Sequence, residues 1–132
     1  MLPNVVKPVQ LLYHGTSVNH SVSIEQEGIR PVNYNRVYLT ADIYVAFNYA
    51  CNKQVKDKDY SGIVICIVDA QKMYMDGFEF THEVTHAEYT VESVPPQYLL
   101  QVIIESEEEL ELFAQYALDY FNYSWLSYWI IL

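Results

Sequence analysis

Residues 62–68 read GIVICIV and constrain the fold more than any other segment of the chain. Nearly every side chain in this run is apolar, and most are β-branched. A strand with one face in water alternates apolar and polar residues, whereas a strand buried on both faces does not. We therefore predict a central strand here, covered by other elements on both sides. The whole chain, residues 1–132, has the size of a single domain.

Four further apolar or β-branched segments predict the remaining strands. They are residues 10–13, 37–41, 78–92 and 99–105, and the segment 78–92 is either one strand or a hairpin. A tight turn is expected at residues 14–16, because a glycine follows the first strand at once.

Helical spacing of apolar residues separates these strands. A first helix is expected between residues 18 and 29, with Gly28 at its C-terminal end. A second begins after Asp42, a plausible N-cap, and the charged segment 53–60 is expected to be a loop. A third runs from residue 107 to about residue 132, starting with acidic residues. The order β-α-β-α-β-β-β-α predicts an α+β fold.

Charge and cysteine content narrow the function classes. Seven Lys and Arg against 17 Asp and Glu give a net charge of −10, which argues against an extended surface that binds nucleic-acid backbone. Cys51 and Cys66 form no CxxC pair, so free thiols in a reducing, cytoplasmic setting are expected. The aromatic segment 120–132 is too short for a membrane span, which needs about 20 apolar residues.

Several residues that could bind a ligand or take part in catalysis lie on the predicted strands and helices. His14 and Gly15 end the first strand, where an imidazole and an open backbone can meet a ligand. Tyr38 and Tyr49 are 11 positions apart, on a strand and the next helix, where they can face a flat ring from two sides. Glu88 is a carboxylate on an otherwise apolar, Thr-rich strand.

These pieces, in this order, resemble the poly(ADP-ribose) polymerase-like ADP-ribosyltransferases of the His-Tyr-Glu class. The resemblance rests on YHGT, VYLTADIYVAFNYAC and EYTVESVPPQYLL, within about residues 10–104. It implies a split two-sheet fold with flanking helices and NAD as co-substrate. It also implies transfer of one ADP-ribose to a protein or nucleic-acid acceptor, with release of nicotinamide.

The resemblance also implies roles for individual residues. His14 would bind the adenosine-side ribose of NAD, and Gly15, with Thr16 beside it, would hold the nicotinamide carboxamide. Tyr38 and Tyr49 would enclose the nicotinamide ring, since aromatic faces suit a flat cation. Glu88 would stabilise positive charge on the ribose as nicotinamide leaves. The expected catalytic residues are thus Glu88, His14 and Tyr38.

Two rival functions stay open. An RNA 2′-phosphotransferase has a related fold and also opens with His-Gly-Thr, but its chemistry calls for several arginines, and this chain offers Arg30 and Arg36. A non-catalytic module that binds NAD, ADP-ribose or a protein is the other rival. Ala46 supports this second rival, because the resembled family usually has a serine at that position.

Other residues have plainer interpretations. Glu83 and Glu92 compete with Glu88 for the catalytic role. His82 and His86 share a strand face, yet no third ligand has a recognisable spacing, so no metal is expected. The aromatic C-terminal segment with Trp125, Tyr128 and Trp129 is either core or the surface for a homotypic or antitoxin-like partner, as in a toxin-like protein.

Overall fold

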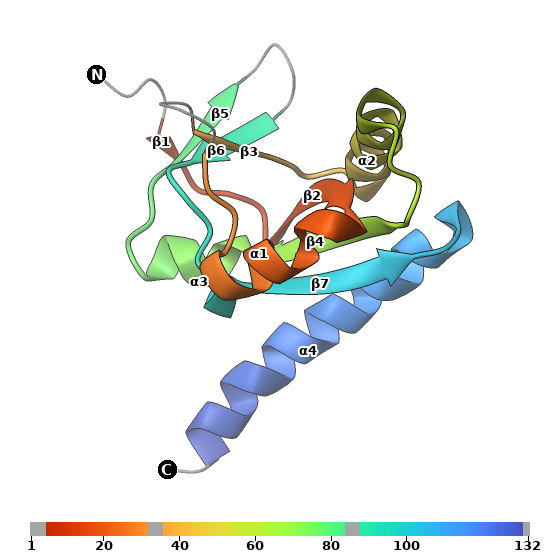
Figure 1. Ribbon diagram of the computed structural model, residues 1–132. Helices are drawn as coiled ribbons and strands as arrows, with labels where there is room; N and C mark the ends of the chain where they lie inside the picture. The colour runs from red at the N-terminus through yellow and green to blue at the C-terminus, as the bar shows by residue number, and fades with distance from the viewer. Residues whose placement is uncertain (1–4, 32–35, 84–87, 131–132) are drawn as a thin grey trace.

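The computed structural model describes residues 5–31, 36–83 and 88–130, and of residues 123–130 it describes the backbone alone. These residues form one seven-stranded sheet with helices on both of its faces (Figure 1). The strand order is β1-β5-β6-β3-β2-β4-β7, and every neighbouring pair is antiparallel. The predicted α+β class is confirmed.

The chain builds these elements in a mixed order. The strands are β1 (Val5–Val6), β2 (Leu11–Ser17), β3 (Val37–Thr40), β4 (Ile63–Asp69), β5 (Phe80–Glu83), β6 (Glu88–Val91) and β7 (Leu99–Ile104). The α-helices are α1 (Ser21–Glu27), α2 (Ile43–Asp57), α3 (Ala70–Met75) and α4 (Leu110–Ile130). Short 3-10 helices precede α1, β7 and α4, at Val18–His20, Pro96–Tyr98 and Glu107–Glu109.

Strand β4 is the centre of the fold, as its apolar run predicts. All of its residues are buried. Val64, Cys66 and Val68 pack into one core cluster, while Ile65 and Ile67 pack into the other, on the opposite face. A strand with a core on both sides has no position for an exposed polar residue, which explains its composition.

The two faces of the sheet carry different helices. Ala46 and Ala50 of α2 join Leu110 and Ala117 of α4 in the cluster on one face. Helices α1 and α3 contribute to the cluster on the other face. Figure 1 shows α4 starting beside the sheet and running past its edge toward the C-terminus.

The predicted division into two sheets is not found, since hydrogen bonds join all seven strands into one. Within the sheet, the pairing between strands β2 and β3 is much shorter than that between β2 and β4. Strands β2 and β3 pair through Tyr13 and Thr40 alone, whereas β2 pairs with β4 from Leu11 to Ser17. The sheet therefore consists of two broad parts joined at the β2–β3 junction.

Two local predictions are wrong. Residues 14–16 are no turn but continue β2, because His14, Gly15 and Thr16 each pair with a residue of β4. The expected loop at 53–60 is largely helix, since α2 continues to Asp57 and ends at Lys58, which has a positive φ of 54°. Helix α3 was not predicted.

Both predicted helix caps are confirmed. The Asp42 carboxylate accepts a hydrogen bond from the Tyr44 backbone N–H at 2.9 Å. Gly28 follows α1 with a φ of 76°, and a Cβ there would lie 2.0 Å from the Val94 carbonyl oxygen. Gly28 is thus required both by its backbone angle and by the close approach of Val94.

The two thiols are free, and Cys66 is buried while Cys51 is partly buried. Burial raises the pKa of Cys66 to about 12, so it is an unreactive core thiol. Among the described helices, none combines the length and apolar character needed to cross a bilayer. The side chains of Trp125, Tyr128 and Trp129, on which the partner-surface prediction rests, lie outside the described residues.

Candidate active site

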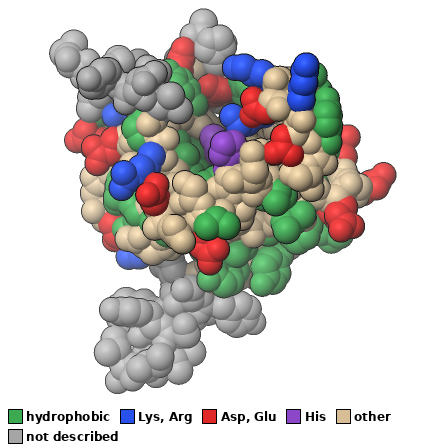
Figure 2. All heavy atoms as spheres, in the orientation of Figure 1, with side chains coloured by type: hydrophobic (Ala, Val, Ile, Leu, Met, Phe, Trp, Pro, Cys, Tyr) green, Lys and Arg blue, Asp and Glu red, His purple; other side chains and the backbone are tan. Residues whose placement is uncertain are grey.

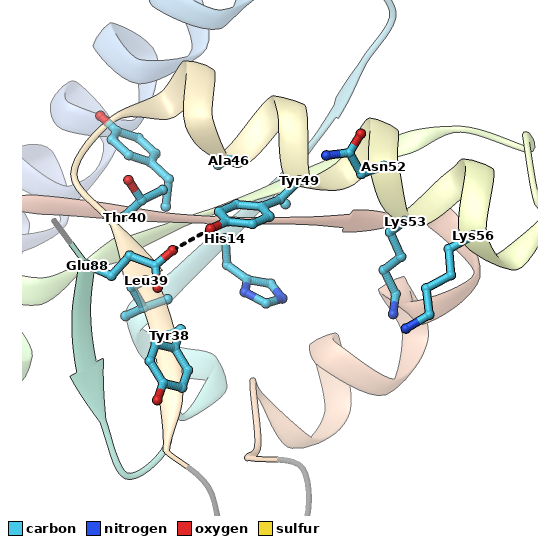
Figure 3. A pocket seen from close by; sticks show the side chains of 12 residues that line it. His14, Tyr38, Leu39, Thr40, Ala46, Tyr49, Asn52, Lys53, Lys56 and Glu88 are labelled. Carbon is cyan, nitrogen blue, oxygen red and sulfur yellow. Dashed lines mark hydrogen bonds between the residues drawn. The ribbon is translucent and has the colours of Figure 1, made fainter. Parts of the chain in front are cut away.

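A cleft of about 380 Å³ lies at the β2–β3 junction, under helix α2 (Figure 3). Because one residue pair joins β2 and β3, the strands do not fill the space beside it. Strands β2, β3 and β6 and helix α2 all contribute to its wall. The lining residues are Tyr13, His14, Gly15, Tyr38, Leu39, Thr40, Ala46, Tyr49, Asn52, Lys53, Lys56 and Glu88.

His14 enters the cleft from β2, next to the buried Cys66 of β4. Burial lowers the pKa of His14 below 6.5, a hydrogen bond with the Tyr38 backbone raises it, and the charges of Lys53 and His20 lower it. The net direction is downward, so the imidazole is neutral at pH 7. A neutral imidazole offers one donor and one acceptor to a ligand.

Glu88 enters the cleft from β6 and is 9% exposed. The Tyr49 hydroxyl donates a hydrogen bond of 2.8 Å to Glu88 Oε1 (Figure 3). This hydrogen bond, then the negative charge of Glu88 and burial, raise the pKa of Tyr49 above 10. The phenol therefore keeps its proton at neutral pH.

Tyr38 and Tyr49 border the cleft from different elements. Tyr38 lies on β3 and is 47% exposed, while Tyr49 lies on α2 and is 53% exposed. Much of both rings is therefore open to a ligand. The sequence prediction that His14, Tyr38, Tyr49 and Glu88 share one cleft agrees with this placement, while their individual roles stay predictions.

The structure explains Gly15 differently from the sequence. A Cβ on Gly15 would lie 1.9 Å from the carbonyl oxygen of Ala46, so the glycine admits the backbone of α2. Its own backbone still lines the cleft. Thr16 is 4% exposed, pairs with Val64, and is not among the described residues that line the cleft.

Sequence reasoning missed three polar residues of the cleft, Asn52, Lys53 and Lys56. Lys53 and Lys56 fell in the segment expected to be a loop, whereas α2 continues through all three residues. The signal was available, because Lys53 and Lys56 follow Tyr49 by four and seven residues, which is one face of a helix. In Figure 3 both lysine side chains extend toward the side of the cleft where His14 lies.

The arginines lie elsewhere. Arg36 donates to Thr90 Oγ1 at 2.8 Å and to the Glu79 carbonyl oxygen at 3.0 Å, so it links strand ends. Arg30 is exposed, and neither arginine is among the described residues that line the cleft. The positive charge in the cleft is therefore supplied by lysine.

No group of metal-binding side chains occurs within the described ranges. His82 lies on β5 with its ring 4.7 Å from that of Tyr89, whereas His86 is outside the described residues. Figure 2 shows Lys and Arg side chains in small groups beside acidic ones on the face that it draws. No extended basic surface forms on this face.

Comparison with known proteins assigns the family. Residues 2–86, more than half of the chain, match the model of the family described as RNA 2′-phosphotransferase, Tpt1 / KptA family. This segment includes His14, Tyr38, Tyr49 and both cleft lysines, but it ends before Glu88.

Similar proteins carry the same description. The chain is 33% identical over 96 residues to "Probable RNA 2′-phosphotransferase" of Rhizobium johnstonii, covering 73% of this chain and 48% of that protein. It is 36% identical over 94 residues to the protein of that name from Rhizobium leguminosarum bv. trifolii, covering 71% and 47%. For the Streptomyces coelicolor protein the identity is 33% over 95 residues, covering 72% and 48%. The chain thus spans about half the length of these curated relatives.

These matches overturn several predictions made from the sequence. Assignment to the poly(ADP-ribose) polymerase-like class is wrong, and so are the functions inferred from it, namely mono-ADP-ribosylation and a toxin-like role. A protein acceptor and an antitoxin-like partner fall with them. His-Gly-Thr misled the assignment because both groups open with it, and the arginine count misled it because lysines occupy the cleft. The chain belongs to the RNA 2′-phosphotransferase, Tpt1 / KptA family.

Proposed function

We propose that this chain removes a 2′-phosphate from RNA, with NAD as co-substrate bound in the cleft at the β2–β3 junction. The observation that carries the proposal is the composition of the cleft, which combines two lysines, a buried carboxylate, a neutral imidazole and two open tyrosine rings. Family membership supports the RNA phosphate as substrate. We further propose an ADP-ribosyltransferase-like fold, in which the narrow β2–β3 junction corresponds to the expected split.

The lysine side of the cleft suits phosphate. Lys53 and Lys56 lie one turn apart on α2, and Asn52 lies beside them. Lys53 is 3.7 Å from Asp57, a long and exposed ion pair that leaves its ammonium available. Two ammonium groups and an amide can together bind a dianionic phosphate, even on a chain whose net charge is −10.

The carboxylate side of the cleft suits the ribose and nicotinamide. Breaking the bond between nicotinamide and ribose places positive charge on the sugar, and a carboxylate in a buried site stabilises that charge. Glu88 is such a carboxylate. The open ring of Tyr38 offers an aromatic face to the cationic nicotinamide.

His14 lies between these two sides. Its neutral imidazole can donate to one ribose hydroxyl or phosphate oxygen while its other nitrogen accepts. In the proposed reaction an oxygen of the RNA 2′-phosphate attacks the ribose carbon from which nicotinamide leaves. The electron pair of the broken C–N bond stays on nicotinamide, and the phosphate now joins the RNA to ADP-ribose. In a second step the neighbouring hydroxyl of that ribose attacks phosphorus, the bond between phosphorus and the RNA 2′-oxygen breaks, and this oxygen takes up the proton of the attacking hydroxyl. The RNA leaves with a 2′-hydroxyl, and the phosphate stays on ADP-ribose.

The test is an RNA oligonucleotide with one internal 2′-phosphate, incubated with the chain and NAD. We expect nicotinamide release and loss of the RNA phosphate in equal amounts, measured by chromatography and mass spectrometry. The matched control is the same oligonucleotide with a 2′-hydroxyl, which should release far less nicotinamide. Loss of phosphate without NAD, or nicotinamide release that ignores the 2′-phosphate, would refute the proposal, and NAD binding without turnover would favour a non-catalytic module.

A further inference from the structure

The hydrogen bond between Tyr49 and Glu88 joins two layers of the molecule. Tyr49 projects from α2, which packs on β2 and β4, whereas Glu88 begins β6, which pairs with β3. Their 2.8 Å hydrogen bond crosses the cleft beside the β2–β3 junction (Figure 3). This side-chain hydrogen bond therefore connects helix α2, which packs on β2 and β4, to strand β6, which pairs with β3.

Glu88 needs a donor in this position. It is 9% exposed, and its register partners are Thr40 on β3 and Glu83 on β5. A buried carboxylate without hydrogen bonds is strongly destabilised, so the phenol both satisfies and orients it. Tyr49 binds Oε1, and the carboxylate has a second oxygen that can accept from a ligand hydroxyl.

The ring of Tyr49 is less constrained than its hydroxyl. The side chain is 53% exposed, so packing holds only part of the ring. The hydroxyl, in contrast, has a short bond to a buried group, and the pKa of Tyr49 is raised mainly by that bond. The phenol stays a donor across neutral pH, and the hydroxyl determines where the ring lies.

We infer that Tyr49 is a positioning residue that acts through Glu88, and that its hydroxyl rather than its ring is the functional group. This inference rests on the proposed function, and it gives Tyr49 a role other than the stacking role that the sequence resemblance implied. The phenol holds the Glu88 carboxylate toward the ribose, so that the second oxygen meets the sugar as nicotinamide leaves.

Tyr49→Phe separates the two roles, since it keeps the ring and removes the hydroxyl. We expect kcat for nicotinamide release to fall about 10- to 100-fold, the range for a lost hydrogen bond to a charged group. The KM for NAD should change much less, because the interaction matters mainly as charge develops. A Tyr49→Phe protein with the kcat of the native chain would show that stacking suffices and would overturn the inference.

Tyr44→Phe is the matched control. Tyr44 lies on the same helix, and its hydroxyl also donates to a carboxylate, Glu111 Oε1, at 3.0 Å, but it does not line the cleft. The same loss of a phenol–carboxylate bond should leave kcat unchanged here. An equal fall in both variants would mean that the effect comes from α2 in general, which would also overturn the inference.

A double-mutant cycle tests whether Tyr49 acts through Glu88. In a Glu88→Ala background, Tyr49→Phe should lower kcat by less than about twofold, because the group it positions is gone. Fully additive effects would assign Tyr49 an independent role and contradict the inference. Thermal melts of all variants establish that each one folds.

An NMR titration with ¹³C-labelled tyrosine separates this inference from the proposed function, since it needs no turnover. Glu88→Ala should lower the pKa of Tyr49 toward 10 and leave that of Tyr44 as it is. An unchanged Tyr49 titration would overturn the pairing, whether or not the chain acts on RNA. A changed titration with no reaction on 2′-phosphorylated RNA would keep the pairing and refute the proposed function.

Discussion

Strand β2 has two neighbours, and they differ sharply. It pairs with β4 along its full length, from Leu11 to Ser17, but with β3 through Tyr13 alone. The β4 side is filled by core residues on both faces, whereas the β3 side opens into the cleft. A complete ladder fixes the position of β2, and the incomplete one leaves room for a ligand beside it.

His14 and Gly15 take part in both the β4 pairing and the cleft. Their backbones are held by Cys66 and Ile65 of β4, while both residues line the cleft. The β4 side of β2, which is the rigid side, thus positions groups that act on the β3 side, which is the open side. Precise sites require such an arrangement. Substitutions can perturb the packing around β2 and the chemistry of the cleft separately.

Glu88→Gln affects the open side alone. The amide keeps the shape of the side chain but removes the charge that stabilises the developing sugar cation. We expect NAD binding to persist and the transfer rate to fall by about 10²–10³, or roughly 2.7–4 kcal/mol. Single-turnover nicotinamide release measures this, with the exposed Glu92→Gln as control. Equal rates in the native chain and Glu88→Gln would remove Glu88 from the mechanism.

Gly15→Ala perturbs the packing of α2 on β2. The new Cβ would meet the Ala46 backbone at 1.9 Å, so α2 must move away from β2. We expect a loss of about 1–3 kcal/mol of unfolding free energy, the usual range for overpacking. Denaturant unfolding measures this loss. A Gly15→Ala protein with the unfolding free energy of the native chain would contradict the close packing of α2 on β2.

The double substitution Lys53→Gln with Lys56→Gln removes the positive charge from the cleft. We expect weaker use of 2′-phosphorylated RNA, about tenfold in kcat/KM, since lysine binds phosphate largely through charge. The salt dependence should also flatten, by a slope of about 1 for each phosphate that a lysine no longer neutralises. The exposed Lys7→Gln is the control. An unchanged salt slope would show that these lysines do not meet phosphate.

The pH dependence of the unfolding free energy should report on the burial of His14. Its pKa in the folded state lies below the unfolded value of 6.5, so in the window beneath 6.5 the unfolded chain binds a proton that the folded chain does not. Stability should therefore fall as pH drops from about 7.5 to about 5.5, by at most about 1.4 kcal/mol per pH unit. His14→Gln should reduce this slope in thermal melts, and an identical slope in both proteins would place the imidazole in water.

The contrast between the two sides also explains what the sequence could predict. The β4 strand was predictable because burial on both faces leaves a continuous apolar run, and Asp42 was predictable because capping is local chemistry. The turn at His14 was predicted wrongly, since glycine signals a turn locally but here admits the backbone of α2. No local pattern reports such a long-range approach.

The site residues that follow from the order of the motifs could be predicted. Those whose position depends on the length of α2 were missed. His14, Tyr38, Tyr49 and Glu88 could be chosen from their order along the chain. Lys53 and Lys56 were missed, because the charged segment suggested a loop, although their helical spacing from Tyr49 places them on the same face of α2. That error hid the positive charge and favoured the wrong family.

Locating NAD on the folded chain decides whether the cleft at the β2–β3 junction is its binding site. A ¹H–¹⁵N NMR titration of the native protein with NAD reports a shift for each backbone amide. We expect the largest shifts around the cleft, at His14, Tyr38 and Tyr49, with little change along β7. Shifts concentrated near Gln101, where another cavity lies between β7 and α1, or no shifts at the cleft, would contradict NAD binding in the cleft.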